Sequence, residues 1–304
     1  MLARIAAVLL AAAAVVSFPS PTQREPDMLI GVYQPNSPGS YGDISAFAAQ
    51  AGFTPRITSY YSTFAMPFPV PFARQAAAQG TTVLVQWQPR GTTNAAVAAG
   101  QDDAYIRQFA LAAASVSWQV IVSYGQEMNG NWYQWGTTGP GNSSPADYVA
   151  AYRHVVDLFR AEGVRNVTWL WDPNVSYAGS TPLAQVYPGD AYVDWVGLDG
   201  YFAHPGDTFA SLFGPSVAEL HAFTAKPLLI AEAGVTGAGG PPQLDSLFAG
   251  ASLAGAVGVV YFDQAQSGDA MHQDWRLENS PAGMTAFRSA VRQYGARPLI
   301  WPAP

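Results

Sequence analysis

The sequence of 304 residues contains no cysteine. This absence excludes disulfide bonds, thiolate metal sites, a cysteine nucleophile and a lipoprotein cysteine. Charged residues are also scarce, at 12% of the chain, and the net charge is −7. Such a chain has no basic surface for nucleic acid phosphates or for an anionic membrane. Nucleic acid is therefore not an expected partner.

Cofactor signatures are missing as well. The sequence has no nucleophile-elbow serine, no phosphate-binding P-loop and no dinucleotide fingerprint. It has four histidines, and no two of them have the spacing of a zinc motif. We therefore predict no required cofactor and no metal site, and leave open a calcium held by loop oxygens. One histidine, His272, follows the last predicted strand and is a candidate for lining a cleft.

Long apolar runs are confined to the first residues. A basic start precedes an apolar run over residues 5–18, and two prolines follow at once. The run is shorter than the ~20 residues of a membrane span, and the pattern is typical of a secretory signal peptide. We predict that residues 1–26 are a signal peptide with a short linker, an uncleaved anchor being the alternative. Residues 27–304 are then one catalytic domain of a secreted protein with no integral membrane span.

Eight short apolar runs recur along this domain, each of strand length. They span residues 29–35, 57–62, 83–89, 120–129, 167–174, 193–201, 227–234 and 256–264.

Helical patterns lie between these runs, for example over 104–116 and 145–162. Strands that alternate with helices indicate a parallel sheet, and eight near-continuous apolar strands indicate closure into a single (β/α)8 TIM barrel. The second connection and the fifth, over 181–190, have weak helical patterns. An open doubly wound sheet therefore stays as the alternative.

Polar residues gather where the apolar runs end, which is the catalytic face of such a barrel. They are Gln34, Gln86, Glu127, Asn129, Asp172, Asn174, Asp199, Glu232, Asp263 and Gln264.

Two glutamates in this set suit glycosidic hydrolysis, which needs one protonated and one ionised carboxyl. Glu127 and Glu232 end the fourth and seventh runs, on roughly opposite sides of the ring, so we expect their carboxyls to meet within about 5 to 6 Å over the mouth. Few charges and many aromatic rings surround Glu127, an environment that raises the pKa of a general acid. Each glutamate alone could instead brace a loop, and Asp172, Asp199 and Asp263 offer other carboxylate pairs.

Aromatic residues are abundant, at 13% of the chain, and rings of this kind often stack on sugars. Position alone makes Tyr60, Trp87, Trp171 and Trp275 candidates for stacking. Packing in the core is an equally good explanation for each of them.

Three segments resemble glycoside hydrolase family 26, which is best known for β-mannanases. GQEMNGNWYQWG, over 125–136, resembles the segment that carries the family's acid/base glutamate. VYPGDAYVDWVGLDGY, over 186–201, resembles its fifth-to-sixth-strand region, and KPLLIAEAG, over 226–234, resembles its nucleophile strand.

The resemblance implies a retaining double displacement on a (β/α)8 barrel, with Glu127 as acid/base and Glu232 as nucleophile. It implies that Tyr201 hydrogen-bonds the nucleophile, that Trp132 and Trp135 bind sugar, and that Asn129 orients the acid/base loop.

Two positions depart from the family pattern. Gln126 stands where the family commonly has histidine, and Ala233 stands where a bulkier residue is more common. We expect these changes to alter sugar specificity rather than hydrolysis. Gln126 and Asp199 remain candidates for substrate contact.

The leading hypothesis is therefore a monomeric, endo-acting retaining hydrolase of a β-linked polysaccharide, with β-mannan as the first candidate and β-glucan as the second. A hydrolase or transglycosylase of a cell-envelope glycan is the alternative within the enzymes. A non-catalytic carbohydrate-binding barrel is the alternative of another class, although a binding module needs no opposed carboxyl pair.

Overall fold

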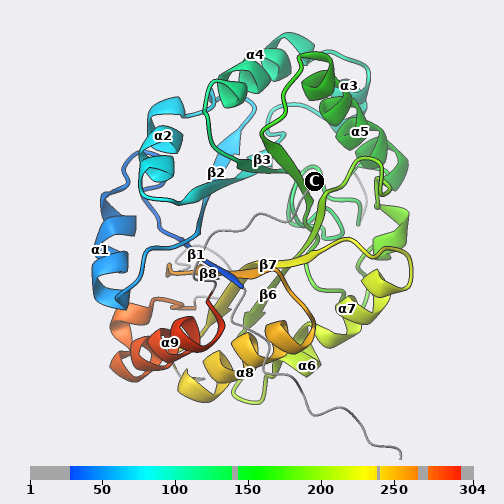
Figure 1. Cartoon of the computed structure of the whole chain (residues 1–304). Helices are drawn as coiled ribbons and strands as arrows, with labels where there is room; N and C mark the ends of the chain where they lie inside the picture. The colour runs from blue at the N-terminus through cyan, green and yellow to red at the C-terminus, as the bar shows by residue number, and fades with distance from the viewer. Residues whose placement is uncertain (1–27, 139–142, 238–239, 266–272, 296–304) are drawn as a thin grey trace, which may run out of the picture.

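The computed structural model describes residues 28–138, 143–237, 240–265 and 273–295. The predicted signal segment and His272 lie outside these residues. Within them, eight parallel strands pair in sequence order and β8 pairs with β1, which closes the barrel (Figure 1). The strands are β1 (Leu29–Tyr33), β2 (Ile57–Thr63), β3 (Thr82–Gln88), β4 (Val120–Tyr124), β5 (Val167–Trp171), β6 (Trp195–Phe202), β7 (Leu228–Val235) and β8 (Gly258–Phe262).

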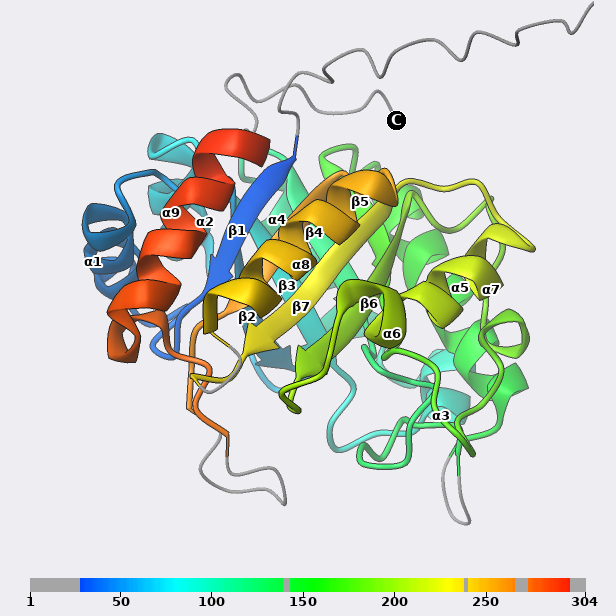
Figure 2. The same cartoon turned by 90° about the horizontal axis from the view of Figure 1, so that it is seen from below.

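The predicted (β/α)8 barrel is confirmed, and the open sheet is excluded by the continuous pairing of β1 with β8. Helices surround the strands as an outer layer, and α8 and α9 are seen against the barrel in Figure 2. The helices are α1 (Gly42–Ala51), α2 (Val70–Ala78), α3 (Asn94–Ala98), α4 (Asp103–Ala114), α5 (Pro145–Ala161), α6 (Phe209–Leu212), α7 (Gly214–His221), α8 (Gly240–Leu253) and α9 (Pro281–Tyr294). The weak second connection does form α2, whereas the fifth contains only the short 3-10 helix η1 (Leu183–Gln185).

Helix α5 shows how local sequence sets an element. The Ser144 hydroxyl accepts the backbone N–H of Asp147, Pro145 occupies the first turn, and Gly163 follows the helix with φ of 73°. A serine cap, a proline in the first turn and a glycine after the end are typical of helix boundaries, and they agree with the predicted helix over 145–162. The face turned to the barrel is built on Tyr152 and Phe159, which pack on Trp169 of β5.

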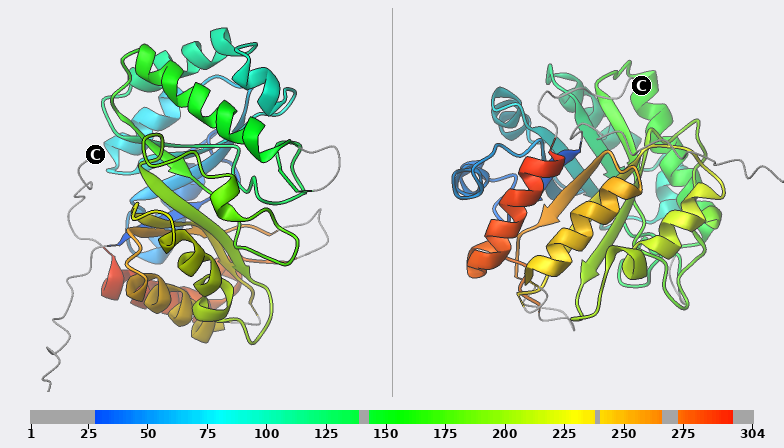
Figure 3. Two further views of the ribbon diagram at one scale, coloured as in Figure 1. Left: turned by 90° about the vertical axis from the view of Figure 1, so that its right-hand side faces the viewer. Right: turned by 60° about the horizontal axis from the view of Figure 1, so that its bottom comes forward.

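Apolar residues from all eight strands fill the barrel interior on the side away from the carboxyl ends of the strands, as is typical of this fold. We call this cluster the apolar plug. The cluster consists of Leu29, Ile57, Leu84, Ile121, Leu170, Trp195, Leu229, Ala231 and Val260. A larger apolar cluster fills the space between the strands and the helix layer. Figure 3 shows the helices around the strands from two further sides. Polar inward-facing residues therefore begin above the plug, toward the carboxyl ends of the strands.

In the described parts of the chain, no helix has the length and hydropathy needed to cross a bilayer.

Candidate active site

Glu127 occupies a strained turn directly after β4. Its φ is 54°, and among the described residues it is the one non-glycine residue with a positive φ. A side chain in this left-handed conformation costs about 1–3 kcal/mol, and such strain clusters at functional sites. Two backbone hydrogen bonds hold the turn, from Glu127 N–H to Asp172 O (2.7 Å) and from Gly130 N–H to Glu127 O (3.1 Å). The fold therefore fixes the direction of this carboxyl.

Each oxygen of the Glu127 carboxyl accepts one hydrogen bond. The Asn174 amide donates to Oε1 (2.6 Å), and the Trp132 indole donates to Oε2 (2.7 Å). Asn129 does not touch this carboxyl. It exchanges two hydrogen bonds with the backbone of Asn174, one to Asn174 O (2.8 Å) and one from Asn174 N–H (3.0 Å). Asn129 thus orients Asn174, and Asn174 orients Glu127.

Glu232 reaches the mouth through an irregularity in β7. Leu198 pairs with Ile230 and Asp199 pairs with Glu232, so Ala231 is an extra residue in the ladder. A bulge of this kind changes which face a side chain points to. Because of it, Ala231 belongs to the apolar plug while Glu232, the next residue, joins the polar layer above.

Three groups donate hydrogen bonds to Glu232. The Tyr61 hydroxyl donates to Oε1 (2.5 Å), the Tyr201 hydroxyl to Oε2 (2.6 Å), and the Gln86 amide to Oε1 (3.2 Å). These donors come from β2, β6 and β3, so three strands converge on one carboxylate. Hydrogen bonds of this type favour its ionised form.

The two glutamates influence each other's ionisation. Both are buried, and no ion pair reaches either of them among the described residues. Burial raises the pKa of Glu127, against the hydrogen bonds from Asn174 and Trp132. Burial and the charge of Glu127 raise the pKa of Glu232, against the hydroxyls of Tyr201 and Tyr61. Two interacting carboxyls without a cation retain one proton between them near neutral pH, as an acid and nucleophile pair requires.

A second carboxyl pair, Asp172 and Asp199, lies fully buried beside the first. Burial raises the pKa of both carboxyls, and the charges of Asp172 and Glu232 raise that of Asp199 further. The pKa of Asp172 rises to about 7 against the hydrogen bond from Gln86, and the pKa of Asp199 lies well above its usual range. The Gln86 amide donates to Asp172 Oδ2 (2.7 Å) as well as to Glu232, and thereby links the two pairs.

Asp263, the remaining candidate for a carboxylate pair, braces loops instead. Its Oδ2 accepts the Gln34 amide (2.7 Å) and its Oδ1 accepts the backbone N–H of Leu277 (2.7 Å). These bonds tie the end of β1 to the segment after β8, so the carboxyl is committed to structure.

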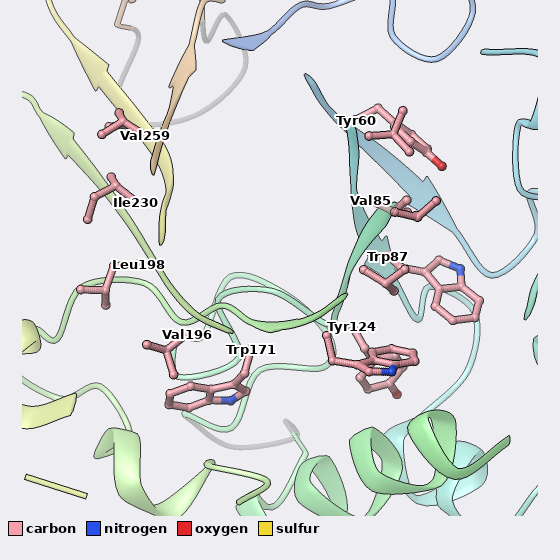
Figure 4. Packing of buried hydrophobic residues seen from close by; sticks show 14 of the residues in the cluster. Tyr60, Val85, Trp87, Tyr124, Trp171, Val196, Leu198, Ile230 and Val259 are labelled. Carbon is pink, nitrogen blue, oxygen red and sulfur yellow. The ribbon is translucent and has the colours of Figure 1, made fainter. Parts of the chain in front are cut away.

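Several predicted sugar contacts are contradicted by burial. Tyr60, Trp87 and Trp171 are all 0% exposed and belong to the cluster between strands and helices, in which Figure 4 shows them. Trp87, for example, stacks on Phe109 of α4 with ring centroids 4.1 Å apart. Side chains alternate along a strand, and these residues point outward. They are core residues and cannot stack on a sugar.

Trp275 is also 0% exposed, and it packs behind Tyr201 with ring centroids 5.0 Å apart. A Cβ added to Gly234 would meet the Trp275 ring at 2.9 Å, so this glycine permits close packing of the indole on β7. Trp275 therefore supports the tyrosine that holds Glu232 and offers no face to a sugar.

The two tryptophans that the family resemblance implies as sugar-binding differ in exposure. Trp132 is 45% exposed beside Glu127, as a sugar platform would be. Trp135 is 2% exposed, stacks on Tyr133 (4.3 Å between centroids) and donates its indole N–H to Gln126 O (2.8 Å). It shapes the turn that carries Glu127.

Gln126 and Asp199 are both 0% exposed, so in this structure neither has surface that a sugar could touch. Direct contact with substrate, as predicted for both, is contradicted. Asp199 lies within the polar layer under the mouth. The Gln126 amide has no hydrogen-bond partner among the described residues.

Four contributors to the site were missed as site residues by sequence reasoning: Tyr61, Gln86, Asn174 and Tyr177. Gln86, which donates to Asp172 and Glu232, was noted only as a polar strand end. Tyr61 lies inside a predicted strand, and its neighbour Tyr60 was chosen instead. Asn174 was noted only as a polar strand end. Tyr177 is 40% exposed and lies 5.8 Å from Trp132, centroid to centroid, on the segment after β5.

These features define a class of protein: a (β/α)8 barrel with two opposed glutamates over its mouth and an exposed indole beside one of them. The model of "Glycosyl hydrolase family 26" matches residues 104–232, a range that contains both glutamates. The chain is therefore similar to this family over that range.

Two curated proteins are similar to parts of the chain. The chain is 28% identical to endoglucanase H of Acetivibrio thermocellus over 242 residues, which are 75% of this chain and 26% of that protein. It is 33% identical to a mannan endo-1,4-β-mannosidase of Bacillus subtilis over 84 residues, which are 26% of this chain and 22% of that protein. The chain thus matches only about a quarter of the length of these two relatives.

Solved structures share the fold. The catalytic domain of the family 26 endo-β-1,4-mannanase from Bacillus sp. JAMB-750 has a TM-score of 0.68 at 19% identity, covering 89% of this chain and 87% of that chain. A modular endo-β-1,4-mannanase from Cellulomonas fimi has a TM-score of 0.67 at 19% identity, covering 90% of this chain and 71% of that chain.

Proposed function

We propose that this protein is a retaining glycoside hydrolase that cleaves a β-linked polysaccharide of the mannan or glucan type. The observation that carries the proposal is the unequal hydrogen bonding of two opposed, buried glutamates. Glu232 accepts three hydrogen bonds and Glu127 accepts two. The larger number of donors favours the negative charge on Glu232. Burial and the charge of Glu127 act in the opposite direction and raise the pKa of Glu232 to about 8. We assign the shared proton to Glu127 because the Tyr61 and Tyr201 hydroxyls donate to Glu232 at 2.5 and 2.6 Å.

The reaction then runs in two steps. In the first, Glu232 attacks the anomeric carbon, the glycosidic bond breaks, and Glu127 gives its proton to the leaving oxygen. In the second, Glu127 takes a proton from water, the water oxygen attacks the same carbon, and Glu232 is released as a carboxylate. Both displacements occur at one carbon, so the configuration of the sugar is retained.

The substrate class rests on the relatives, which are named as an endoglucanase and as mannan endo-1,4-β-mannosidases. The site itself favours an uncharged glycan because no arginine or lysine pairs with its carboxyls among the described residues. The alternative of a silent binding barrel is disfavoured, since a binder gains nothing from four buried carboxyls whose charges act on one another.

The test compares two variants on two substrates. Glu232→Ala removes the nucleophile and should abolish turnover of both a polysaccharide and a 2,4-dinitrophenyl β-glycoside. Glu127→Ala should abolish turnover of the polysaccharide and spare the first step on the dinitrophenyl substrate, because a good leaving group needs little protonation. Equal loss on both substrates in Glu127→Ala would refute its role as acid.

The proposal includes export, because residues 1–26 have the pattern of a cleaved signal peptide. N-terminal sequencing of protein recovered from the culture medium should begin near residue 27. We propose further that the protein acts as a monomer. A sedimentation mass of one chain would agree, and twice that mass would contradict it.

A further inference from the structure

Trp132 and Tyr177 are unusual for their exposure. Among the described residues they are the two aromatic side chains that are more than a third exposed, at 45% and 40%. They are also neighbours, with ring centroids 5.8 Å apart and planes inclined by 33°. Exposed rings that adjoin each other form an apolar patch, and such patches on a polar surface mark binding sites.

The patch lies on the side of Glu127. Trp132 donates its indole N–H to the Glu127 carboxyl. Burial and the charge of Glu127 raise the pKa of Tyr177, whereas burial and the charge of Glu232 raise the pKa of Tyr33. The hydrogen bond and the ring contact thus connect the patch to Glu127 through Trp132.

The segment that carries Tyr177 is held in place. Ser176 donates to the Glu219 carboxylate of α7 (2.7 Å), and its N–H donates to Ser216 Oγ (2.7 Å). On the other side, Thr181 N–H donates to Asn129 O (3.0 Å), in the turn that carries Glu127. The ring is thus positioned before any ligand binds, which lowers the entropic cost of binding.

We infer that Tyr177 extends the Trp132 platform and stacks on a pyranose of the leaving chain, beyond the scissile bond. This inference rests on the proposed function, in which Glu127 protonates the oxygen of the leaving sugar. A chain whose leaving end runs from Glu127 over Trp132 next meets Tyr177. The occupant is an uncharged β-linked hexose whose C–H face lies flat on the ring.

The experiment uses Tyr177→Ala and Tyr177→Phe with two kinds of probe. The first kind is the β-1,4-linked hexasaccharides of mannose and of glucose, which fill the leaving side. The second is a 2,4-dinitrophenyl β-disaccharide of the same sugar, which has no sugar on that side. Burial of one ring face predicts that Tyr177→Ala lowers kcat/KM on the hexasaccharide about tenfold, mainly through KM.

The dinitrophenyl probe separates stacking from damage to the catalytic pair. Tyr177→Ala should hydrolyse it like the wild type, and Tyr177→Phe should match the wild type on both probes because the ring is kept. Leu253→Ala is the control, since Leu253 is a 91% exposed side chain at the end of α8. It should change neither rate.

The outcomes distinguish the two proposals. If the wild type is active and Tyr177→Ala keeps its full rate on the hexasaccharide, or loses equally on both probes, the stacking role is wrong and the proposed function stands. If the wild type cleaves no probe, the proposed function fails and the stacking role fails with it.

Discussion

Tyr201→Phe removes one hydrogen bond from Glu232, the carboxylate that we propose as nucleophile. The loss can be measured as a shift in the pH dependence of the reaction rate. The Tyr201 hydroxyl donates to Glu232 Oε2 at 2.6 Å and is the one donor to that oxygen among the described residues. Phenylalanine keeps the ring, its packing on Trp275 (5.0 Å) and its edge contact with Phe262 (5.6 Å). The substitution therefore removes the hydroxyl alone.

The size of the effect follows from the charge on the acceptor. A hydrogen bond to a charged group contributes about 1.5–3 kcal/mol. One pKa unit corresponds to about 1.36 kcal/mol, so the loss raises the pKa of Glu232 enough to move its titration by about one to two pH units. The sign is upward, because the lost bond stabilised the ionised form.

The assay is the pH dependence of kcat/KM on a dinitrophenyl β-glycoside, whose acidic limb reports the nucleophile in the free enzyme. In Tyr201→Phe this limb should move to higher pH, and the rate on the plateau should also fall. Tyr60→Phe is the matched control, because the Tyr60 hydroxyl is buried with no hydrogen-bond partner among the described residues. An acidic limb at the same pH in Tyr201→Phe and the wild type would refute the role of this hydroxyl.

Four further substitutions have defined outcomes. Asn174→Ala removes the amide that donates to Glu127 Oε1. Because a charge-assisted hydrogen bond contributes about 1.5–3 kcal/mol, kcat on a polysaccharide should fall at least tenfold, with a smaller loss on a dinitrophenyl glycoside. Equal losses on the two substrates would contradict this. Asp199→Asn should raise the melting temperature at pH 8 and not at pH 4. Burial raises the pKa of Asp199 in the folded protein above its unfolded value near 4, so the folded protein loses stability as the pH rises from the unfolded pKa to the folded pKa. An equal change in melting temperature at both pH values would be inconsistent with this pKa shift. Gly197→Ala should lower the melting temperature, since its Cβ would meet Asp172 Oδ1 at 2.1 Å, and an unchanged melting curve would refute that contact. Trp87→Ala should reduce the free energy of unfolding by about 3–5 kcal/mol in urea titrations and leave KM unchanged, whereas a raised KM would restore its predicted sugar contact.

The barrel could be predicted from the sequence because each strand is an apolar run bounded by polar residues, and because helix α5 has a start and an end that are visible in its own residues. Glu127 and Glu232 could be selected because each ends such a run. The 3-10 connection before β6 could also be anticipated, since residues 181–190 lack a helical pattern.

Which way a strand residue points could not be predicted. In a parallel barrel both faces of a strand are buried, so hydrophobicity does not distinguish inside from outside. Tyr60 and Tyr61 show the consequence: the first packs under the helices and the second bonds Glu232. The bulge at Ala231, which turns Glu232 into the mouth, has no signature in the sequence either.

Contacts between loops also could not be predicted from the sequence. Asn129 and Asn174 are 45 residues apart and bond each other reciprocally, and the exposure of Tyr177 depends on where its loop is pinned. The family resemblance correctly indicated that Tyr201 hydrogen-bonds Glu232. It could not show that Trp135 and Asp199 lie beneath the surface.

Trapping the covalent glycosyl–enzyme intermediate tests which glutamate is the nucleophile. A 2-deoxy-2-fluoro β-glycoside with a dinitrophenyl leaving group is incubated with the enzyme, which is then digested and analysed by mass spectrometry. A covalent sugar on Glu232, in the peptide that contains β7, is the expected result. A label on Glu127, Asp172 or Asp199, or turnover without any label and with inversion at the anomeric carbon, would contradict the mechanism.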